Sequence, residues 1–285
     1  MTKREKTIKK KADVFVYINA VIMVLLAVAF ILPFWMMITA SFSNDMKLIQ
    51  NGLGLTFQGF GFSAYTKLFQ SGQLLRSAGV TLFVSCAAAL LSVAVCTGAA
   101  YVLSKKTIAG RKFLTWYFTI PMFFGGGAIP LYLVIRNVGL YDTVWALILP
   151  CVASLGNIVL MRNYFYGLPA TLAEAAELDG ANELQSLIHV FCPLAVPMMF
   201  TIGLITFVGR WNSWLDSLMY LGVKNEKLWM VQYTLRTMLD SQAGSTATIS
   251  QKNAAIVIAA MPLVLISPIL HKYFAAGITA GAVKG

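Results

Sequence analysis

The sequence predicts an all-α, polytopic membrane protein with six transmembrane helices, and two observations support this class. Of its 285 residues, 58% are hydrophobic and only 12% are charged, and the mean hydropathy is +0.73. Water-soluble domains carry about 25% charged residues, so these values exclude that class. The second observation is the uncharged run of 25 residues from Val14 to Ile38. About 20 apolar residues suffice for a helix to cross a hydrocarbon core of roughly 30 Å.

The first apolar run is predicted to be a permanent anchor. A cleaved secretory signal has an apolar core of about 7 to 15 residues followed by a small-residue cleavage site, and this run matches neither feature. Five further apolar runs are bounded by charge or turn residues and are predicted to cross the membrane: 77–104, 113–135, 142–161, 194–216 and 254–274.

Basic residues predict the orientation of these helices. The segment before the first helix and the one between the second and third are short and rich in Lys and Arg, which places both in the cytoplasm. Six crossings then place the C-terminus and the connection between helices four and five on the same side. We therefore expect a cytoplasmic N-terminus at 1–13, a transmembrane domain at 14–275 with outer loops at 40–74 and 217–253, and a cytoplasmic tail at 276–285. The net charge of +11 is explained by topology and attraction to anionic lipid rather than by nucleic acid.

Motifs for catalysis or metal binding are missing from the sequence. It contains no Walker phosphate loop, no HExxH and no nucleophile elbow. None of the four cysteines has metal-like spacing, and His189 and His271 are both expected at membrane edges. We therefore predict neither a catalytic site nor a metal site in this chain.

The stretch TLAEAAELDGANEL, which begins at Thr171, is the strongest local signal. It holds four of the eleven acidic residues of the chain. Thr171 with Glu174, and again Asn182 with Gln185, have the spacing of a helix capping box, and Gly180 between them can take a positive φ and end the first helix. The pattern predicts a helix, a sharp bend and a second helix on the cytoplasmic side.

Two interpretations of this hairpin are open. Acidic residues keep any surface loop solvated, so a plain cytoplasmic hairpin would explain the charges. The alanines beside the acids favour a docking element instead, because small side chains permit close approach and acids pair with a basic rim.

The spacing of the hairpin resembles the EAA loop of ABC-importer permeases. That loop reads E-A-A, three residues, G, nine residues, I, one residue, L, P, and here Val190 replaces the isoleucine and Cys192 the leucine. In that family the loop forms the coupling helices that dock in a cleft of the cytoplasmic ATPase. The resemblance implies a coupling loop at 167–193 whose ATPase-coupling residues are Glu174, Ala175, Ala176, Asp179, Gly180, Leu184 and Pro193.

Longer stretches resemble the six-helix, maltose-type carbohydrate permeases over essentially the whole chain. They are FGGGAIPLYLVIRNVGLYDTVWALILP (124–150), ELDGANELQSLIHVFCPLAVP (177–197), WNSWLDSLMYL (211–221) and AAGITAGAVKG (275–285). The glycine-rich third helix points to the complex-oligosaccharide branch. The resemblance implies the type I ABC importer permease fold and a C-terminal tail that contacts the ATPase through Gly277, Gly281 and Lys284, although a frayed glycine-rich end is the simpler alternative.

The same resemblance implies the partners of the chain and its place in the cell membrane. They are a second related permease, two ABC ATPase subunits and an extracytoplasmic solute-binding protein that delivers a carbohydrate. ATP and Mg²⁺ would bind the ATPase, so this chain needs no cofactor of its own. Unlike an enzyme, it would catalyse no reaction.

A sugar path needs polar and aromatic side chains within the bundle, because hydroxyl groups need hydrogen-bond partners and ring faces stack on aromatic rings. Each candidate also has a structural explanation. The Arg and Trp residues suit an interfacial anchor, the glycines a helix kink, and the asparagine a hydrogen bond between helices. The candidates are Gly126, Gly127, Asn157, Arg210, Trp211, Asn212, Trp214 and Asp216.

Three other functions compete with this one. A secondary carrier driven by an ion gradient would need carboxylates deep in the membrane, and the nearest, Asp142 and Asp216, lie at helix ends. An intramembrane enzyme or scaffold would need clustered His, Asp, Glu or Cys at bilayer depth. An ABC permease for a non-sugar solute, such as an amino acid or phosphate, stays open, because only the resemblance argues against it.

Overall fold

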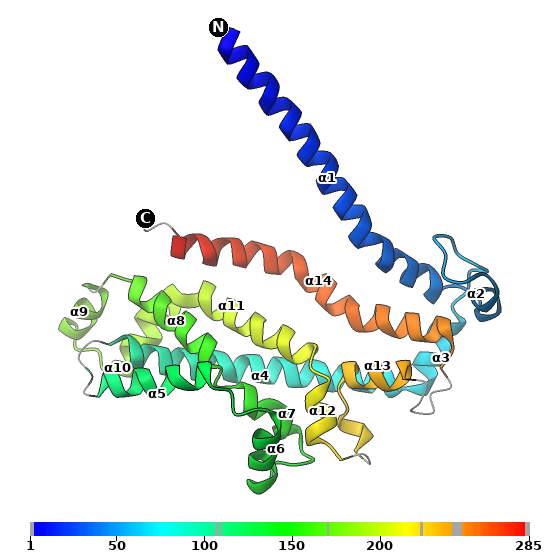
Figure 1. Cartoon of the computed structure of the whole chain (residues 1–285). Coiled ribbons are helices and arrows are strands. Elements are labelled where there is room, and N and C mark those ends of the chain that lie inside the picture. The colour runs from blue at the N-terminus through cyan, green and yellow to red at the C-terminus, as the bar shows by residue number, and fades with distance from the viewer. Residues whose placement is uncertain are drawn as a thin grey trace. The chain divides into compact units, whose positions relative to one another are not determined.

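The computed structural model describes residues 3–105, 108, 110–169, 171–222, 225–240 and 247–282, with side chains described between 15 and 268. Within these ranges all regular structure is helical, as predicted (Figure 1). The chain divides into two compact units, Met1–Ser71 with Ser241–Ile258, and Gly72–Asp240 with Ala259–Gly285.

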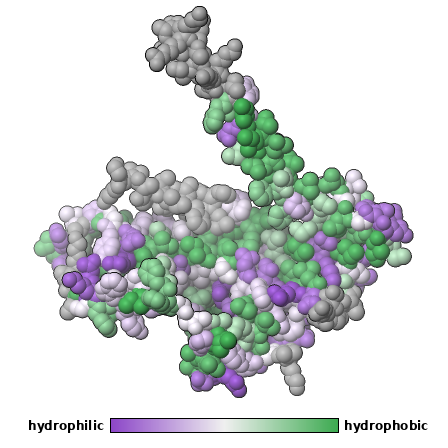
Figure 2. Space-filling view, viewed as in Figure 1, coloured by the Kyte–Doolittle hydropathy of each residue, from purple (hydrophilic) through white to green (hydrophobic). Residues whose placement is uncertain are grey.

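The first unit is dominated by the 39-residue helix α1, which is longer at both ends than the predicted 14–38 span. Its described apolar side chains are largely exposed, and none of the most apolar window within Phe15–Ser41 is buried (Figure 2). An apolar, unburied helical segment of 27 residues, Phe15–Ser41, is suited to a lipid environment or to another membrane subunit. The helices of this unit are α1 (Lys3–Ser41), α2 (Asp45–Asn51), α3 (Ser63–Ser71) and the first turns of α14 (Ile249–Ala282).

The predicted outer loop 40–74 is compactly folded. Phe42 packs against Phe57, Phe60, Phe62 and Tyr65, with ring centroids between 4.8 and 6.3 Å from its own. Aromatic rings at these distances stabilise a segment beyond the area they bury. The loop is therefore held by an aromatic cluster around Phe42.

The second unit is built around α4, which packs against α8 and α11. Small, fully buried side chains on α4, such as Ala88, Cys96 and Ala100, allow these helices to approach closely. The unit contains α4 (Gln73–Ser104), α5 (Arg111–Phe123), α6 (Ala128–Asn137), α7 (Val144–Ile148), the 3₁₀ turn η1 (Leu149–Cys151), α8 (Leu155–Gly167), α9 (Thr171–Leu178), α10 (Glu183–Ser186), the π turn η2 (Leu187–Phe191), α11 (Cys192–Trp211), α12 (Leu215–Tyr220), η3 (Glu226–Leu228), α13 (Val231–Leu239) and the rest of α14.

Among the described residues, four single helices are long and apolar enough to cross a membrane, and two bent pairs bring the number to six when each pair is one span. The third span is one of these pairs, since α5 and α6 meet at 118°. The break lies at Gly125 to Gly127, where Gly127 has a φ of +86°. The predicted weakness of this helix is confirmed, but the break is too sharp for the single 113–135 helix that hydropathy indicated. The fourth span bends by 41° between Val144–Cys151 and Leu155–Gly167.

The fifth span differs from the prediction at its start. The sequence placed a boundary at Pro193, yet the helix runs without interruption from Glu183 to Trp211. Pro193 lies in the first turn of α11, directly after the π turn η2. A local π adjustment re-satisfies backbone groups that a proline leaves unpaired, so the helix passes through it.

The predicted outer loop 217–253 contains α13, which is fastened to α4. Ser77 and Thr234 share a hydrogen bond of 2.6 Å, and the Val231 amide donates to the Thr81 hydroxyl at 2.7 Å. Val231, Thr234 and Leu235 are all buried. This part of the predicted loop is therefore a packed element of the bundle.

Candidate functional site

The stretch from Thr171 forms the predicted hairpin, and Gly180 makes its bend. Gly180 has a φ of +77°, and its amide donates to the Glu177 carbonyl at 3.1 Å, while the Ala181 amide donates to the Ala176 carbonyl at 3.0 Å. These two bonds form a Schellman motif, which satisfies carbonyls at the end of α9 and requires a left-handed residue. The positive φ predicted for Gly180 is confirmed.

The two predicted capping boxes have different outcomes. The Asn182 and Gln185 side chains each accept a hydrogen bond from the backbone amide of the other residue, both at 2.9 Å, so the second box is confirmed. Thr171 is itself the first residue of α9, so the prediction that it caps the helix is wrong by one position. The residue before it lies outside the described part of the chain.

The hairpin rests on an apolar cluster of the bundle. Ala173, Leu187 and Val190 pack against this cluster, in which the rings of Tyr101 and Phe191 meet edge to face at 5.1 Å. The sequence predicts that Ala175 and Ala176 both let a partner approach closely. Ala176 is 94% buried, whereas Ala175 is exposed. The small side chain of Ala176 thus allows α9 to lie close to its own bundle, and Ala175 is the alanine available to a partner.

A polar tie joins the second helix of the hairpin to the end of α4. The Tyr101 hydroxyl donates to Glu183 Oε2 at 2.8 Å, and Lys105 forms an ion pair with the same oxygen. Lys105 Nζ also lies 3.9 Å from Glu177 and 5.1 Å from the Tyr101 ring centroid. Burial lowers the pKa of Lys105, but hydrogen bonds and charge interactions with Glu183 and Tyr101 outweigh it and leave the pKa raised. The lysine is therefore fully charged at neutral pH, which favours the ion pair.

The sequence does not predict this tie. Lys105 belongs to the basic segment between the second and third predicted helices, and Tyr101 lies within the predicted 77–104 span. No spacing rule connects residues 101 and 183. Only the packing of α4 against the hairpin brings them together.

The exposed side chains of the hairpin include both apolar and acidic residues. Leu178 is 89% exposed, Leu184 64% and Ile188 51%, beside the exposed acids Glu174 and Asp179. Large aliphatic side chains on a loop that served only solubility would be unfavourable, whereas an apolar patch rimmed by charge is typical of a protein interaction site. The structure therefore favours the docking interpretation. Leu184 is one of the ATPase-coupling residues that the resemblance implies, whereas Leu178 and Ile188 are not among them.

The cluster around Arg210 is largely internal. Arg210 forms an ion pair with Asp216, which also accepts a hydrogen bond from Ser213 at 2.7 Å. Trp211 is 98% buried, and its indole N–H donates to the Ala259 carbonyl at 3.0 Å. The ion pair of Arg210 with Asp216 and the indole hydrogen bond of Trp211 hold these residues at the C-terminal end of α11.

The remaining path candidates are more accessible. Arg236 lies over the half-buried Trp214 ring at 3.8 Å, and Asn212 is exposed. Gly126 and Gly127 are exposed at the break between α5 and α6, where a Cβ at Gly126 would meet no described atom within 4 Å. The three tail residues cannot be assigned a contact: Gly277 and Gly281 lie in α14, which is helical to Ala282, and Lys284 lies outside the described residues.

Asn157 links three helices. Its Nδ2 donates to Thr206 Oγ1 at 3.2 Å, and Thr206 Oγ1 donates to Ser92 Oγ at 3.3 Å. Asn157 is 95% buried. The hydrogen bond between helices that the sequence predicted for Asn157 is confirmed, and it joins α8 to α11 and α4.

Replacing Asn157 with leucine is expected to lower the free energy of unfolding by about 0.6 to 1.7 kcal/mol, the range for such bonds within membranes. Thermal unfolding of the purified chain in detergent measures this loss, and Thr206→Val is the matched variant from the other side of the bond. Unchanged stability together with weakened transport of the substrate would instead place Asn157 on the path.

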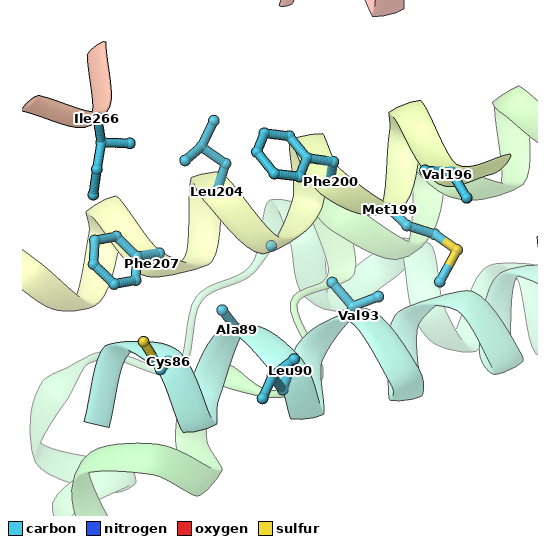
Figure 3. A pocket seen from close by; sticks show the side chains of 11 residues that line it. Cys86, Ala89, Leu90, Val93, Val196, Met199, Phe200, Leu204, Phe207 and Ile266 are labelled. Carbon is cyan, nitrogen blue, oxygen red and sulfur yellow. The ribbon is translucent and has the colours of Figure 1, made fainter. Parts of the chain in front are cut away.

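An apolar groove runs between α4 and α11 (Figure 3). Its volume is about 510 Å³, and Leu90, Val93, Phe200 and Phe207 are among its lining residues, with Ile266 from α14. A carbohydrate needs hydrogen-bond partners for its hydroxyl groups, and this lining supplies almost none. The groove is therefore not a sugar site. Among the described side chains no three His, Cys, Asp or Glu residues lie together as metal ligands would.

A multi-pass helical bundle with a partly apolar hairpin between two spans is consistent with a membrane component of a transport system. The chain belongs to the family described as the binding-protein-dependent transport system inner membrane component, whose model matches residues 99–280. It is therefore a multi-pass membrane protein and a transporter subunit.

Individual relatives agree with this family. The chain is 34% identical over 266 residues to protein LplC of Bacillus subtilis, covering 90% of each chain. It is 31% identical over 275 residues to the polygalacturonan/rhamnogalacturonan transport system permease protein YtcP of the same organism, covering 92% of this chain and 96% of YtcP. It also matches a chain in the crystal structure of a bacterial ABC transporter involved in the import of the acidic polysaccharide alginate, with a TM-score of 0.84, 29% identity, and coverage of 93% of this chain and 98% of the other.

Proposed function

We propose that the chain is a permease subunit of an ATP-driven importer for an oligosaccharide, and that the hairpin from Thr171 to Phe191 transmits the motion of a cytoplasmic ATPase to the bundle. The observation that carries this proposal is the exposed, acid-rimmed face of Leu178, Leu184 and Ile188 on a hairpin whose other face is fastened to α4. A rigid connection on one side and a free apolar surface on the other suit a docking element that moves with its partner.

The assembly follows from the family and from the resemblance of the hairpin to the EAA loop. A second permease completes the path, two ATPase subunits bind ATP and Mg²⁺, and a solute-binding protein delivers the substrate outside the cell. The N-terminus, the hairpin and the C-terminus lie in the cytoplasm. This chain binds no cofactor and catalyses no reaction. The tail around Gly277 and Gly281 contacts the ATPase.

The mechanism links closure of the ATPase dimer to a change in the direction that the substrate path faces. ATP binding closes the ATPase dimer, and the hairpin carries this movement through Glu183 and Lys105 into α4. The path then opens outward and accepts the substrate from the binding protein, and hydrolysis returns it to the inward-facing state. The break at Gly126 and Gly127 lies where a span can change its angle without a side-chain clash.

The substrate class is inferred from the relatives. YtcP is named for polygalacturonan and rhamnogalacturonan, the solved transporter is involved in alginate import, and a relative of Thermococcus litoralis, 27% identical over 294 residues, is named for trehalose and maltose. A carbohydrate of two or more linked sugar units is the substrate class common to these names, and we infer an oligosaccharide for this chain. A non-sugar solute is the alternative.

The proposal is tested with the solute-binding protein of the same transport system. Oligosaccharides, including uronic-acid oligomers, are expected to raise its melting temperature. The same oligosaccharides should enter proteoliposomes that contain the complete transporter only when ATP and the binding protein are present. Uptake driven by an ion gradient without the ATPase, or a binding protein stabilised by amino acids or phosphate alone, would contradict it.

A further inference from the structure

A basic cavity lies between the first turn of α5 and α8, apart from the hairpin and the path candidates. Arg111, Lys112 and Arg162 line it together with Thr115 and Trp116, and its volume is about 240 Å³. All five residues belong to the second unit. Arg111 and Lys112 belong to the basic segment that predicts the orientation of the helices, and no sequence pattern indicates a role for Arg162.

Two guanidinium groups converge on one neutral oxygen beside this cavity. Arg111 donates a hydrogen bond to the Tyr166 hydroxyl, and Arg162 donates to the same oxygen at 3.0 Å. The two guanidinium carbons lie 5.5 and 4.9 Å from the Tyr166 ring centroid. The hydroxyl itself donates to the Leu103 carbonyl at 3.2 Å. Tyr166 thus holds two like charges close together but does not neutralise them.

These cations lack a counter-charge within the described chain. The ion pairs among described side chains involve Lys105 and Arg210, and none involves Arg111, Lys112 or Arg162. Arg111 Nε is buried and has no hydrogen-bond partner there. Convergent, unneutralised guanidinium groups favour binding of an anion, and Arg matches the geometry of phosphate oxygens.

Aromatic side chains indicate where the cavity opens. Phe113, Trp116 and Tyr117, from the same first turns of α5, are 72%, 65% and 63% exposed. Exposed Trp and Tyr beside cations at one end of an apolar helix are typical of the membrane–water interface. The cavity therefore lies at the depth of lipid headgroups, which favours a phosphate that belongs to a lipid over one that is free in solution.

We infer that Arg111, Lys112 and Arg162 form a site for the phosphate group of an anionic phospholipid. The two guanidinium groups bind the phosphate oxygens, Lys112 adds a third charge, and Trp116 lies against the glycerol end of the headgroup. Basic pockets between transmembrane helices bind anionic headgroups in this way. The site is independent of the substrate and of the hairpin contacts.

The experiment uses the full chain in its purified transporter, placed in nanodiscs of phosphatidylcholine with increasing phosphatidylglycerol, and counts retained lipids by native mass spectrometry. Retention of phosphatidylglycerol is expected to fall about fivefold for each charge removed by Arg162→Gln or Lys112→Gln. Lys112 is exposed, so its replacement leaves the fold intact even if that of Arg162 does not. Arg136→Gln is the matched control, since Arg136 is exposed in the last turn of α6 and lies outside the cavity.

Two further arms separate the alternatives. Inorganic phosphate is added to the phosphatidylcholine nanodiscs, and protection of the wild type by phosphate alone, with no preference for phosphatidylglycerol, would overturn the lipid assignment. Equal lipid retention in all variants, with loss of a partner subunit only in Arg162→Gln and Lys112→Gln, would show that the cations pair with acids of that subunit and would also overturn it. Selective loss of phosphatidylglycerol in these two variants alone supports the site.

Discussion

Replacing Gly180 with valine is expected to reduce ATP-driven uptake about 5- to 30-fold while the chain still inserts into the membrane. Gly180 has a φ of +77°, and a left-handed conformation costs an L-residue about 1 to 2 kcal/mol, more when it is β-branched. A cost of this size lowers the ratio of the native bend to other conformations by the stated factor, which is the upper bound of the loss. A Cβ at this position would meet nothing within 4 Å, so the effect arises from the backbone rather than from a clash within the chain.

A series of substitutions at position 180 separates the effect of the backbone conformation from the effect of side-chain size. Asparagine tolerates the left-handed region, so Gly180→Asn is the matched control and should retain most of the uptake, with Gly180→Ala between the two. Uptake and ATP hydrolysis are measured in the same proteoliposomes, after size-exclusion chromatography has shown an intact complex. Normal uptake by the valine variant would remove Gly180 from the coupling path. Equal loss in the valine and asparagine variants would mean that the partner approaches too closely for any side chain.

Replacing Glu183 with alanine is the change with the second largest expected effect, a several-fold loss of uptake with little loss of stability. Its carboxylate accepts from the Tyr101 hydroxyl at 2.8 Å and pairs with Lys105, which fastens the hairpin to α4. The side chain is 67% exposed, and exposed ion pairs contribute only about 0 to 1 kcal/mol to stability. The tie therefore matters for the position of the hairpin more than for folding.

The pairing partners allow a double-mutant cycle. Tyr101→Phe and Lys105→Gln each remove one contact, and their effects should not add to that of Glu183→Ala, because all three side chains act as one unit. Glu226→Gln is the matched control, since Glu226 is also exposed but lies in η3, outside the hairpin. Wild-type uptake by Glu183→Ala, or full additivity with Tyr101→Phe, would exclude transmission through this tie.

Local patterns predicted the hairpin more accurately than the membrane spans. Gly180 and the box of Asn182 with Gln185 depend on contacts within about five residues, so their conformation can be read from spacing alone. The predicted boundaries of the spans differ more from the structure. Hydropathy predicts neither the π turn before Pro193 nor the 118° angle between α5 and α6. Both depend on how the backbone accommodates proline and glycine among neighbouring helices.

The residues of the candidate sugar path show that the sequence alone does not predict which partners a side chain contacts. Arg210, Trp211 and Asp216 satisfied the chemical requirements of a sugar site, yet the fold pairs Arg210 with Asp216 and buries Trp211 against α14. These three residues can bind a sugar or pair with groups of the fold, and the neighbouring helices decide between the two roles. Their composition cannot distinguish the two.

The sequence by itself determined the helical class, the membrane setting, the resemblance to ABC-importer permeases and the bend at Gly180. These properties follow from composition, from the length of apolar runs and from contacts between near neighbours in the chain. Only the tertiary structure decided which face of the hairpin is free, that Glu183 is tied to Tyr101 and Lys105, and that Arg111 and Arg162 meet at Tyr166. The reason is physical: an ion pair or a hydrogen bond acts over a few ångströms, and packing of the helices sets which distant residues come that close.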